Sequence, residues 1–177
     1  MNLRDVMVAV VVLSMPMAMI ACTQTVGGSA ERAVQPADTP GRGYGFVDDR
    51  CGLLLDTSVA EIVGADTAVR PYSGAVCQYV KSRQGSVIDL TFSWFETGTL
   101  DRERSLAEQN HAQVSDVEVQ RHQAFLARRS VTGNACSATA ATNPGVVSWW
   151  VQIRGDAAAD PCTDAQNLLA KTLSSDM

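Results

Sequence analysis

The residues of this chain with the clearest capacity for chemistry are its five cysteines. One stands near the start of the chain, at Cys22, and the other four lie beyond residue 50. Those four are Cys51, Cys77, Cys136 and Cys162. None of them belongs to a Cys-x-x-Cys pair, and the chain has only two histidines. A tetrahedral zinc site built from loop knuckles needs such pairs, so the spacing argues against one.

Four spaced cysteines in an exported chain are typical of two disulfides rather than of thiols or metal ligands. Three pairings can be drawn, and we favour Cys51–Cys77 with Cys136–Cys162 because the two loops then have the same length. Each bond would contribute about 3.5 kcal/mol by the chain-entropy estimate, and its loss would cost about 2–5 kcal/mol. The alternative is four free buried thiols, which would contradict export.

Cys22 closes a segment that is typical of an export signal. No charged residue occurs between Val6 and Ala21, a run shorter than the ~20 apolar residues of a membrane-spanning helix. The run ends in Met19-Ile20-Ala21-Cys22, which resembles a bacterial lipobox with Met in place of the usual Leu. We therefore predict a lipoprotein signal peptide over residues 1–21 and acyl chains on Cys22. The alternatives are an ordinary signal peptide with an incidental cysteine, or an uncleaved anchor.

Catalytic chemistry has little support in the sequence. A hydrolase nucleophile needs a Ser or Cys beside a His, and no G-x-S-x-G elbow is present. The contexts of His111 and His122 indicate solvent exposure. The carboxylates that could form an acid–base pair share one predicted helix with arginines, as on a solvated face; they are Glu96, Asp101, Glu103 and Glu108. We therefore predict no catalytic residue, no metal site, no cofactor and no enzymatic activity.

Two sets of residues are candidates for ligand contact. Trp149 and Trp150 are adjacent in an expected strand, so their side chains must point to opposite faces. Trp150, or Trp94 in another strand, is a candidate ligand platform, although a core or helix-covered position is the favoured interpretation. The second set, Arg121, Arg128 and Arg129, could form a basic cluster that contacts anionic lipid headgroups or cell-wall phosphate, or be plain surface charge.

The elements that must position these residues begin after a tether. Residues 22–49 are rich in Gly, Pro, Thr and Ala without apolar periodicity, so we expect a lipidated cysteine followed by a flexible linker. The globular domain is expected over residues 50–177.

Within the domain, apolar periodicity predicts strands and helices. We expect a short helix over 59–63 capped by residues 56–58, and a helix over 101–109. We also expect strands over 77–81, 88–94, 114–119, 124–127, 135–140 and 146–153, and a final helix that begins at Asp160. The turns are expected at 83–86, 133–134 and 143–145. Hairpins in the middle and helices at the two ends predict an α+β fold with an antiparallel sheet.

Composition and charge limit the function. The net charge of −5 argues against nucleic acid as a partner, because phosphate binding needs a basic surface. The share of hydrophobic residues, 46%, fits one globular domain and excludes a wholly disordered or multi-span membrane protein.

Five short motifs, together with the lipobox, make the chain similar to a known family. They are Cys51-Gly52-Leu53, Cys77-Gln78-Tyr79, Phe92-Ser93-Trp94, Arg102-Glu103-Arg104 and Asp160-Pro161-Cys162. Over residues 50 to about 174 the chain resembles the actinobacterial Cys-containing lipoproteins of unknown function, which include mycobacterial lipoproteins of the LprB/LprC type. It also resembles the two-disulfide extracellular sensor domains of some actinobacterial kinases. The resemblance implies the compartment and the architecture, and lends no catalytic residues.

These observations lead to two functional hypotheses. The first is a lipid-anchored protein on the extracytoplasmic face of the cell membrane, with a non-enzymatic ligand-binding or sensor-like domain. Its ligand would be an envelope lipid or glycan. The second is an accessory subunit that docks on a membrane transporter or another envelope protein. An apolar pocket lined by Trp94 or Trp150 would favour the first hypothesis, and a flat exposed apolar patch the second.

Overall fold

The computed structural model describes residues 43–130, 134–155 and 159–175. Across these ranges the chain forms one antiparallel seven-stranded sheet with three helices, which confirms the predicted α+β class. The predicted signal peptide, the lipid attachment at Cys22 and most of the tether lie outside the described residues.

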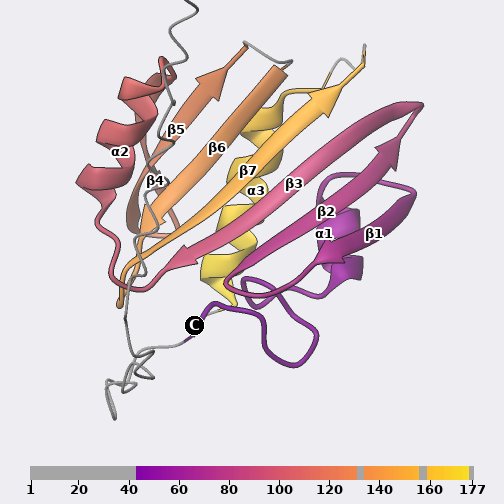
Figure 1. Ribbon diagram of the computed structural model, residues 1–177, viewed down its shortest axis with the longest axis horizontal. Coiled ribbons are helices and arrows are strands. Elements are labelled where there is room, and N and C mark those ends of the chain that lie inside the picture. Colours follow the sequence, from indigo (N-terminus) through magenta and orange to yellow (C-terminus); the bar gives the residue numbers. More distant parts are fainter. Residues whose placement is uncertain (1–42, 131–133, 156–158, 176–177) are drawn as a thin grey trace, which may run out of the picture. The chain divides into compact units, whose positions relative to one another are not determined.

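The strands are β1 (Thr67–Tyr72), β2 (Val76–Arg83), β3 (Ser86–Phe95), β4 (Gln113–Val119), β5 (His122–Arg129), β6 (Asn134–Ala141) and β7 (Val146–Arg154). The helices are α1 (Asp56–Ile62), α2 (Leu100–Gln109) and α3 (Pro161–Ser174). The spatial order of strands is β1-β2-β3-β7-β6-β5-β4, so the last strand in the chain lies at the centre of the sheet (Figure 1). Strand β1 is the one element that the sequence pattern did not predict.

Alternation of side chains explains how the sheet divides its two faces. In β3, Ile88, Leu90 and Phe92 are buried, while Asp89 and Thr91 between them are half-buried. The turn between β2 and β3 is formed by Gln84 and Gly85, both at positive φ, as a tight two-residue hairpin requires. The predicted hairpin at this position is therefore confirmed.

Helix α3 covers one face of the sheet, and it lies behind the strands in Figure 1. Its apolar stripe, which includes Leu168, Leu169 and Leu173, is buried against the core together with Trp149. Asp160 caps the helix, because its Oδ2 atom accepts a hydrogen bond from the Thr163 backbone N–H at 3.2 Å. The predicted start of this helix is confirmed.

Both predicted disulfides are present. Cys51–Cys77 joins the loop before α1 to β2, and Cys136–Cys162 joins β6 to the first turn of α3. Each bond therefore fastens a segment at one end of the domain to the sheet.

Two local predictions are corrected by the structure. Asp56 does not cap α1: the helix begins at Asp56 itself, the residue before it is Leu55, and no side chain supplies a cap hydrogen bond. Asp56 instead accepts a hydrogen bond from Arg70 Nη1 at 2.8 Å, which takes its carboxylate toward β1.

The second correction concerns the start of the folded domain, which was predicted at residue 50. Tyr44 is buried in the core, its ring packs edge-on against Trp94, and its carbonyl accepts a hydrogen bond from the Gly52 N–H. Arg70 lies over the Phe46 ring and pairs with Asp49. The residues from 43 onward therefore belong to the folded domain rather than to the tether.

Candidate functional site

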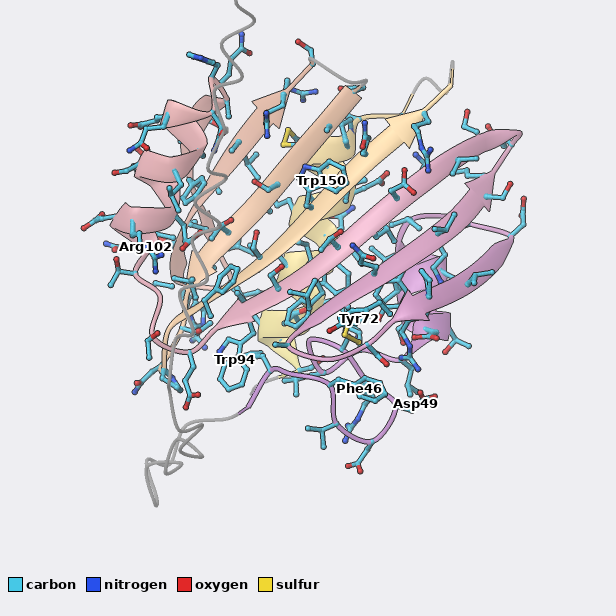
Figure 2. The ribbon with its side chains drawn as sticks, in the orientation of Figure 1. Phe46, Asp49, Tyr72, Trp94, Arg102 and Trp150 are labelled. Carbon is cyan, nitrogen blue, oxygen red and sulfur yellow. A yellow bond between two sulfur atoms is a disulfide. The ribbon has the colours of Figure 1, made fainter. Side chains whose placement is uncertain are left out.

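Trp149 and Trp150 point to opposite faces of the sheet, as predicted. The Trp149 side chain is fully buried on the α3 side, where its indole N–H donates a 2.9 Å hydrogen bond to Thr172 Oγ1. Trp150 is partly exposed on the other face, near the middle of the sheet (Figure 2). One strand thus gives one tryptophan to the core and one to a surface.

Helix α2 covers only part of the Trp150 face, and none of its residues is buried. Arg104 attaches it to the sheet, because its guanidinium pairs with Asp116 in β4 and lies 5.2 Å from the centre of the Phe125 ring in β5. The side chain of Thr99 caps the helix by accepting a hydrogen bond from the Arg102 N–H. Helix α2 therefore covers this face of the sheet without burying any of its own residues.

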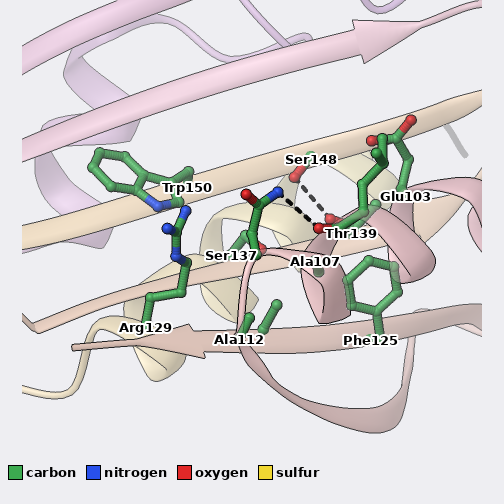
Figure 3. A pocket seen from close by; sticks show the side chains of 12 residues that line it. Glu103, Ala107, Ala112, Phe125, Arg129, Ser137, Thr139, Ser148 and Trp150 are labelled. Atoms are coloured by element: carbon green, nitrogen blue, oxygen red, sulfur yellow. Dashed lines mark hydrogen bonds between the residues drawn. The ribbon is translucent and has the colours of Figure 1, made fainter. Parts of the chain in front are cut away.

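A hollow of about 190 Å³ lies between α2 and the sheet, and we call it the α2 hollow. Its wall comes from α2 and the turn after it, and its floor from β5, β6 and β7 (Figure 3). The lining residues are Glu103, Leu106, Ala107, Asn110, Ala112, Phe125, Ala127, Arg129, Ser137, Thr139, Ser148 and Trp150.

The chemistry of the α2 hollow combines an aromatic surface with hydroxyl groups. Thr139 Oγ1 and Ser148 Oγ share a 2.8 Å hydrogen bond on the floor. The Arg129 side chain points toward the Trp150 indole, and Glu103 stands on the α2 side (Figure 3). An apolar surface with a few placed polar groups is the usual composition of a small-molecule site.

A second hollow of about 220 Å³ lies on the other side of Trp150, over β1, β2, β3 and β7, and we call it the open hollow. Its lining residues are Pro71, Gln78, Tyr79, Val80, Asp89, Leu90, Thr91, Trp150 and Gln152. Trp150 is therefore shared by both hollows. Asp89 makes two contacts with Arg154, at 2.6 and 2.7 Å, which compensate its charge.

Trp94, the other predicted ligand platform, lies elsewhere. Its side chain is on the α3 side of β3, where it packs against Tyr44, and its indole N–H donates to the Pro144 carbonyl at 3.4 Å. Figure 2 shows it far from Trp150, at the end of the sheet. The two tryptophans therefore do not form one site.

The three arginines predicted as a cluster are not brought together. Arg121 lies in the turn between β4 and β5, whereas Arg128 and Arg129 lie at the far end of β5. Arg128 and Arg129 point to opposite faces because they are neighbours in a strand, and Arg128 pairs with Asp160 at 2.5 Å. Only Arg129 lines the α2 hollow.

The buried polar cluster on the opposite face was not anticipated from the sequence. Lys81 is buried, its ammonium lies 5.2 Å from the Tyr79 ring centre, and it contacts the Asp56 carbonyl at 3.4 Å. Burial lowers the pKa of Lys81. Burial, reinforced by the Asp56 charge, raises the pKa of Tyr79 to about 12. Because Lys81 joins β2 to the start of α1 through the Asp56 carbonyl, we assign this cluster to the attachment of the N-terminal segment to the sheet.

A second buried pair joins β2 to α3. Arg83 and Asp164 form an ion pair at 3.0 Å, and Arg83 also donates to the Val63 carbonyl at 2.6 Å. Burial raises the pKa of Asp164, and the Arg83 charge opposes that shift. The pair holds three elements together on the α3 side.

The two histidines lie near opposite ends of β4. The His122 ring approaches the Ala141 carbonyl at 2.9 Å, and His111 ends the turn after α2. Among the described residues, no three His, Cys, Asp or Glu side chains are grouped so that they could hold a metal ion. The same residues include no helix long and apolar enough to cross a bilayer.

Comparison with known proteins places the chain in a family. Residues 17–175 match the family described as protein of unknown function DUF3558. Proteins named "Putative lipoprotein LprB" are similar to the chain. The one from Mycobacterium bovis is 25% identical over 78% of this chain and 76% of its own length, and the one from Mycobacterium leprae is 24% identical over 78% and 75%. No solved structure matches the chain significantly. Because the family match spans most of the sequence, this chain belongs to the DUF3558 family of proteins of unknown function.

Proposed function

We propose that this chain is a lipid-anchored envelope lipoprotein whose folded domain binds a small ligand between α2 and the sheet. The anchor rests on the lipobox-like Met19-Ile20-Ala21-Cys22 sequence and on relatives that carry the name lipoprotein. Acyl chains on Cys22 would hold the domain at the extracytoplasmic face of the cell membrane.

The observation that carries the ligand-binding role is the α2 hollow. Its floor places the partly exposed Trp150 beside the hydroxyls of Ser137, Thr139 and Ser148. Its wall is a helix without a buried residue, so a shift of the helix to admit a ligand would uncover Phe125 and Ala127 of the floor but none of the apolar side chains packed around α3.

We further propose that the domain binds its ligand without transforming it. The charged groups that line the hollow are Glu103 and Arg129, and neither histidine is among the lining residues. The hollow therefore contains no Ser–His pair of the kind that nucleophilic catalysis uses, and the Ser148 hydroxyl is engaged with Thr139.

A second candidate function is that of an accessory subunit on a membrane protein. It is favoured by three exposed valines, Val69, Val80 and Val87, on the part of the sheet that α2 leaves uncovered. Apolar side chains exposed in this way are a feature of docking surfaces.

Native mass spectrometry of the full-length protein, extracted from its own envelope in mild detergent, tests the binding role. We expect a retained mass beyond the chain and its acyl groups. Ala107→Phe should remove it by filling the hollow, whereas Glu108→Gln, on the same helix but outside the lining, should not. A bound protein subunit instead of a small mass would favour the accessory role.

The anchor is tested separately. Cys22→Ser should release the protein from membranes or leave it unprocessed, with its thermal unfolding unchanged, because residue 22 precedes the folded domain. If the Cys22→Ser protein stays membrane-bound with its original mass, the lipobox interpretation is wrong.

A further inference from the structure

Trp150 stands at the boundary between the two hollows and lines both of them. Across the sheet, Trp150 pairs with Thr91 in β3 on one side and with Ser137 in β6 on the other, and Gln78 in β2 pairs with Thr91. Neighbouring strands lie about 4.8 Å apart, so this row places a polar side chain next to the indole in each direction. The row runs from the open hollow into the α2 hollow.

The polar groups around Trp150 are mostly uncharged amides and hydroxyls. Gln78 and Thr91 line the open hollow, and Ser137, Thr139 and Ser148 line the α2 hollow. Such groups both donate and accept hydrogen bonds, so they match a ligand that carries many hydroxyl groups.

The formal charges of the side chains at each hollow sum to zero. In the α2 hollow the carboxylate of Glu103 and the guanidinium of Arg129 have opposite signs. In the open hollow Asp89 is paired with Arg154 through both of its carboxylate oxygens. Neither hollow therefore carries a net formal charge, and the chain as a whole carries a charge of −5, which disfavours polyanions.

We propose that this face of the sheet binds an uncharged oligosaccharide. One sugar ring lies flat on the Trp150 indole, with its C–H face against the π surface, and its neighbours occupy the two hollows. The hydroxyls of these rings bond to Gln78 and Thr91 on one side and to Ser137 on the other. This inference rests on the proposed ligand-binding function and names its ligand class.

Two further hollows in the described part of the chain, of about 300 and 310 Å³, lie along the edge strand β4, and neither is lined by an aromatic side chain. Their charged groups are already engaged, since Arg104 pairs with Asp116 and Arg128 with Asp160. Of these four hollows, the two beside Trp150 are therefore the ones that combine an aromatic side chain with uncharged polar groups.

The test is binding of the full-length protein, in detergent micelles, to an array of immobilised neutral and acidic oligosaccharides. We expect binding to neutral members, weakened about tenfold or more by Trp150→Ala and less by Trp150→Phe, which keeps an aromatic face. Phe95→Ala is the matched control, because Phe95 is an exposed aromatic residue outside both hollows. Its variant should bind like the wild type. Thermal unfolding of each variant verifies that it is folded.

Two further variants test whether the ligand spans both hollows. Gln78→Ala and Ser137→Ala should each weaken binding severalfold, since they lie on opposite sides of the indole. If only one of the two substitutions weakens binding, the ligand occupies a single hollow and the spanning arrangement is wrong.

The outcomes separate this inference from the proposed function. Absence of binding to every neutral oligosaccharide, or binding that Trp150→Ala leaves unchanged, overturns the inference. If a non-carbohydrate mass is retained in native mass spectrometry and lost in Trp150→Ala, the ligand-binding function stands and the oligosaccharide is wrong. If no mass is retained and the protein binds no oligosaccharide on the array, both the ligand-binding function and the oligosaccharide inference are wrong.

Discussion

Helices α2 and α3 lie on opposite faces of the same sheet and are attached to it in different ways. More than half of the 14 residues of α3 are buried, and a disulfide at Cys162 and a hydrogen bond at Thr172 fix the helix to β6 and β7. Helix α2 buries no residue and is attached mainly through Arg104. Most of the stabilising burial is therefore on one face.

This difference indicates how the domain can hold a site without losing stability. Burial of apolar surface is the main favourable contribution to folding, and the α3 face contains most of it. Because the α2 face contributes less to stability, it can contain a half-exposed tryptophan, several hydroxyl groups and a helix that moves.

The largest effect is expected for the adjacent tryptophans. Trp149→Ala should lower the free energy of unfolding by about 3–5 kcal/mol, because it empties a fully buried volume and leaves Thr172 without its donor. Trp150→Ala should cost about 1 kcal/mol or less, because that side chain is partly exposed. Urea unfolding of both variants measures the difference. Equal losses in the free energy of unfolding would show that the two faces of the sheet contribute equally to stability.

The second comparison uses one leucine from each helix. Leu168 in α3 is 0% exposed and Leu106 in α2 is 40% exposed. Leu168→Ala should destabilise the domain by about 3 kcal/mol, and Leu106→Ala by about 0.5 kcal/mol. Chemical denaturation of this matched pair tests the difference with the same chemical change. A Leu106→Ala cost above that of Leu168→Ala would contradict it.

The third prediction concerns pH and the buried polar cluster on the α3 side. The pKa of Tyr79 is raised to about 12, mainly by burial, whereas an unfolded tyrosine ionises near pH 10. Between these values the unfolded chain loses the proton and the folded chain keeps it, so stability falls as pH rises through this window.

The loss attributable to Tyr79 is roughly 2 kcal/mol by pH 12. Tyr79→Phe should therefore lose less stability than the wild type between roughly pH 9 and pH 11, as followed by urea midpoints. A wild type and a variant that lose stability equally over this range would show that Tyr79 ionises alike in both states.

Much of the fold could be predicted because its signals are local. Alternation in β3 and β7, the Asn and Gly turn residues, and the cap at Asp160 each depend on a few neighbouring residues. Strand β1 was missed because Arg70 and Pro71 interrupt the alternation, and proline is tolerated there only because β1 is an edge strand.

The site could be predicted only in part. The opposite directions of Trp149 and Trp150 follow from strand geometry, and the same rule separates Arg128 from Arg129. The pairing of Trp150 with Ser137 depends on the register between strands and on the central place of β7, which no local pattern encodes. The position of α2 over this row is a tertiary contact, so the α2 hollow was not visible in the sequence.

Native-state hydrogen exchange tests the central claim most directly, because it reports the opening of each helix separately. If α3 is part of the core and α2 is a thin cover, the amides of α3 should exchange only by global unfolding. The amides of α2 should exchange by local opening, about a hundredfold faster or more. Equal protection of the two helices would contradict the account, because α2 would then be as integral to the fold as α3.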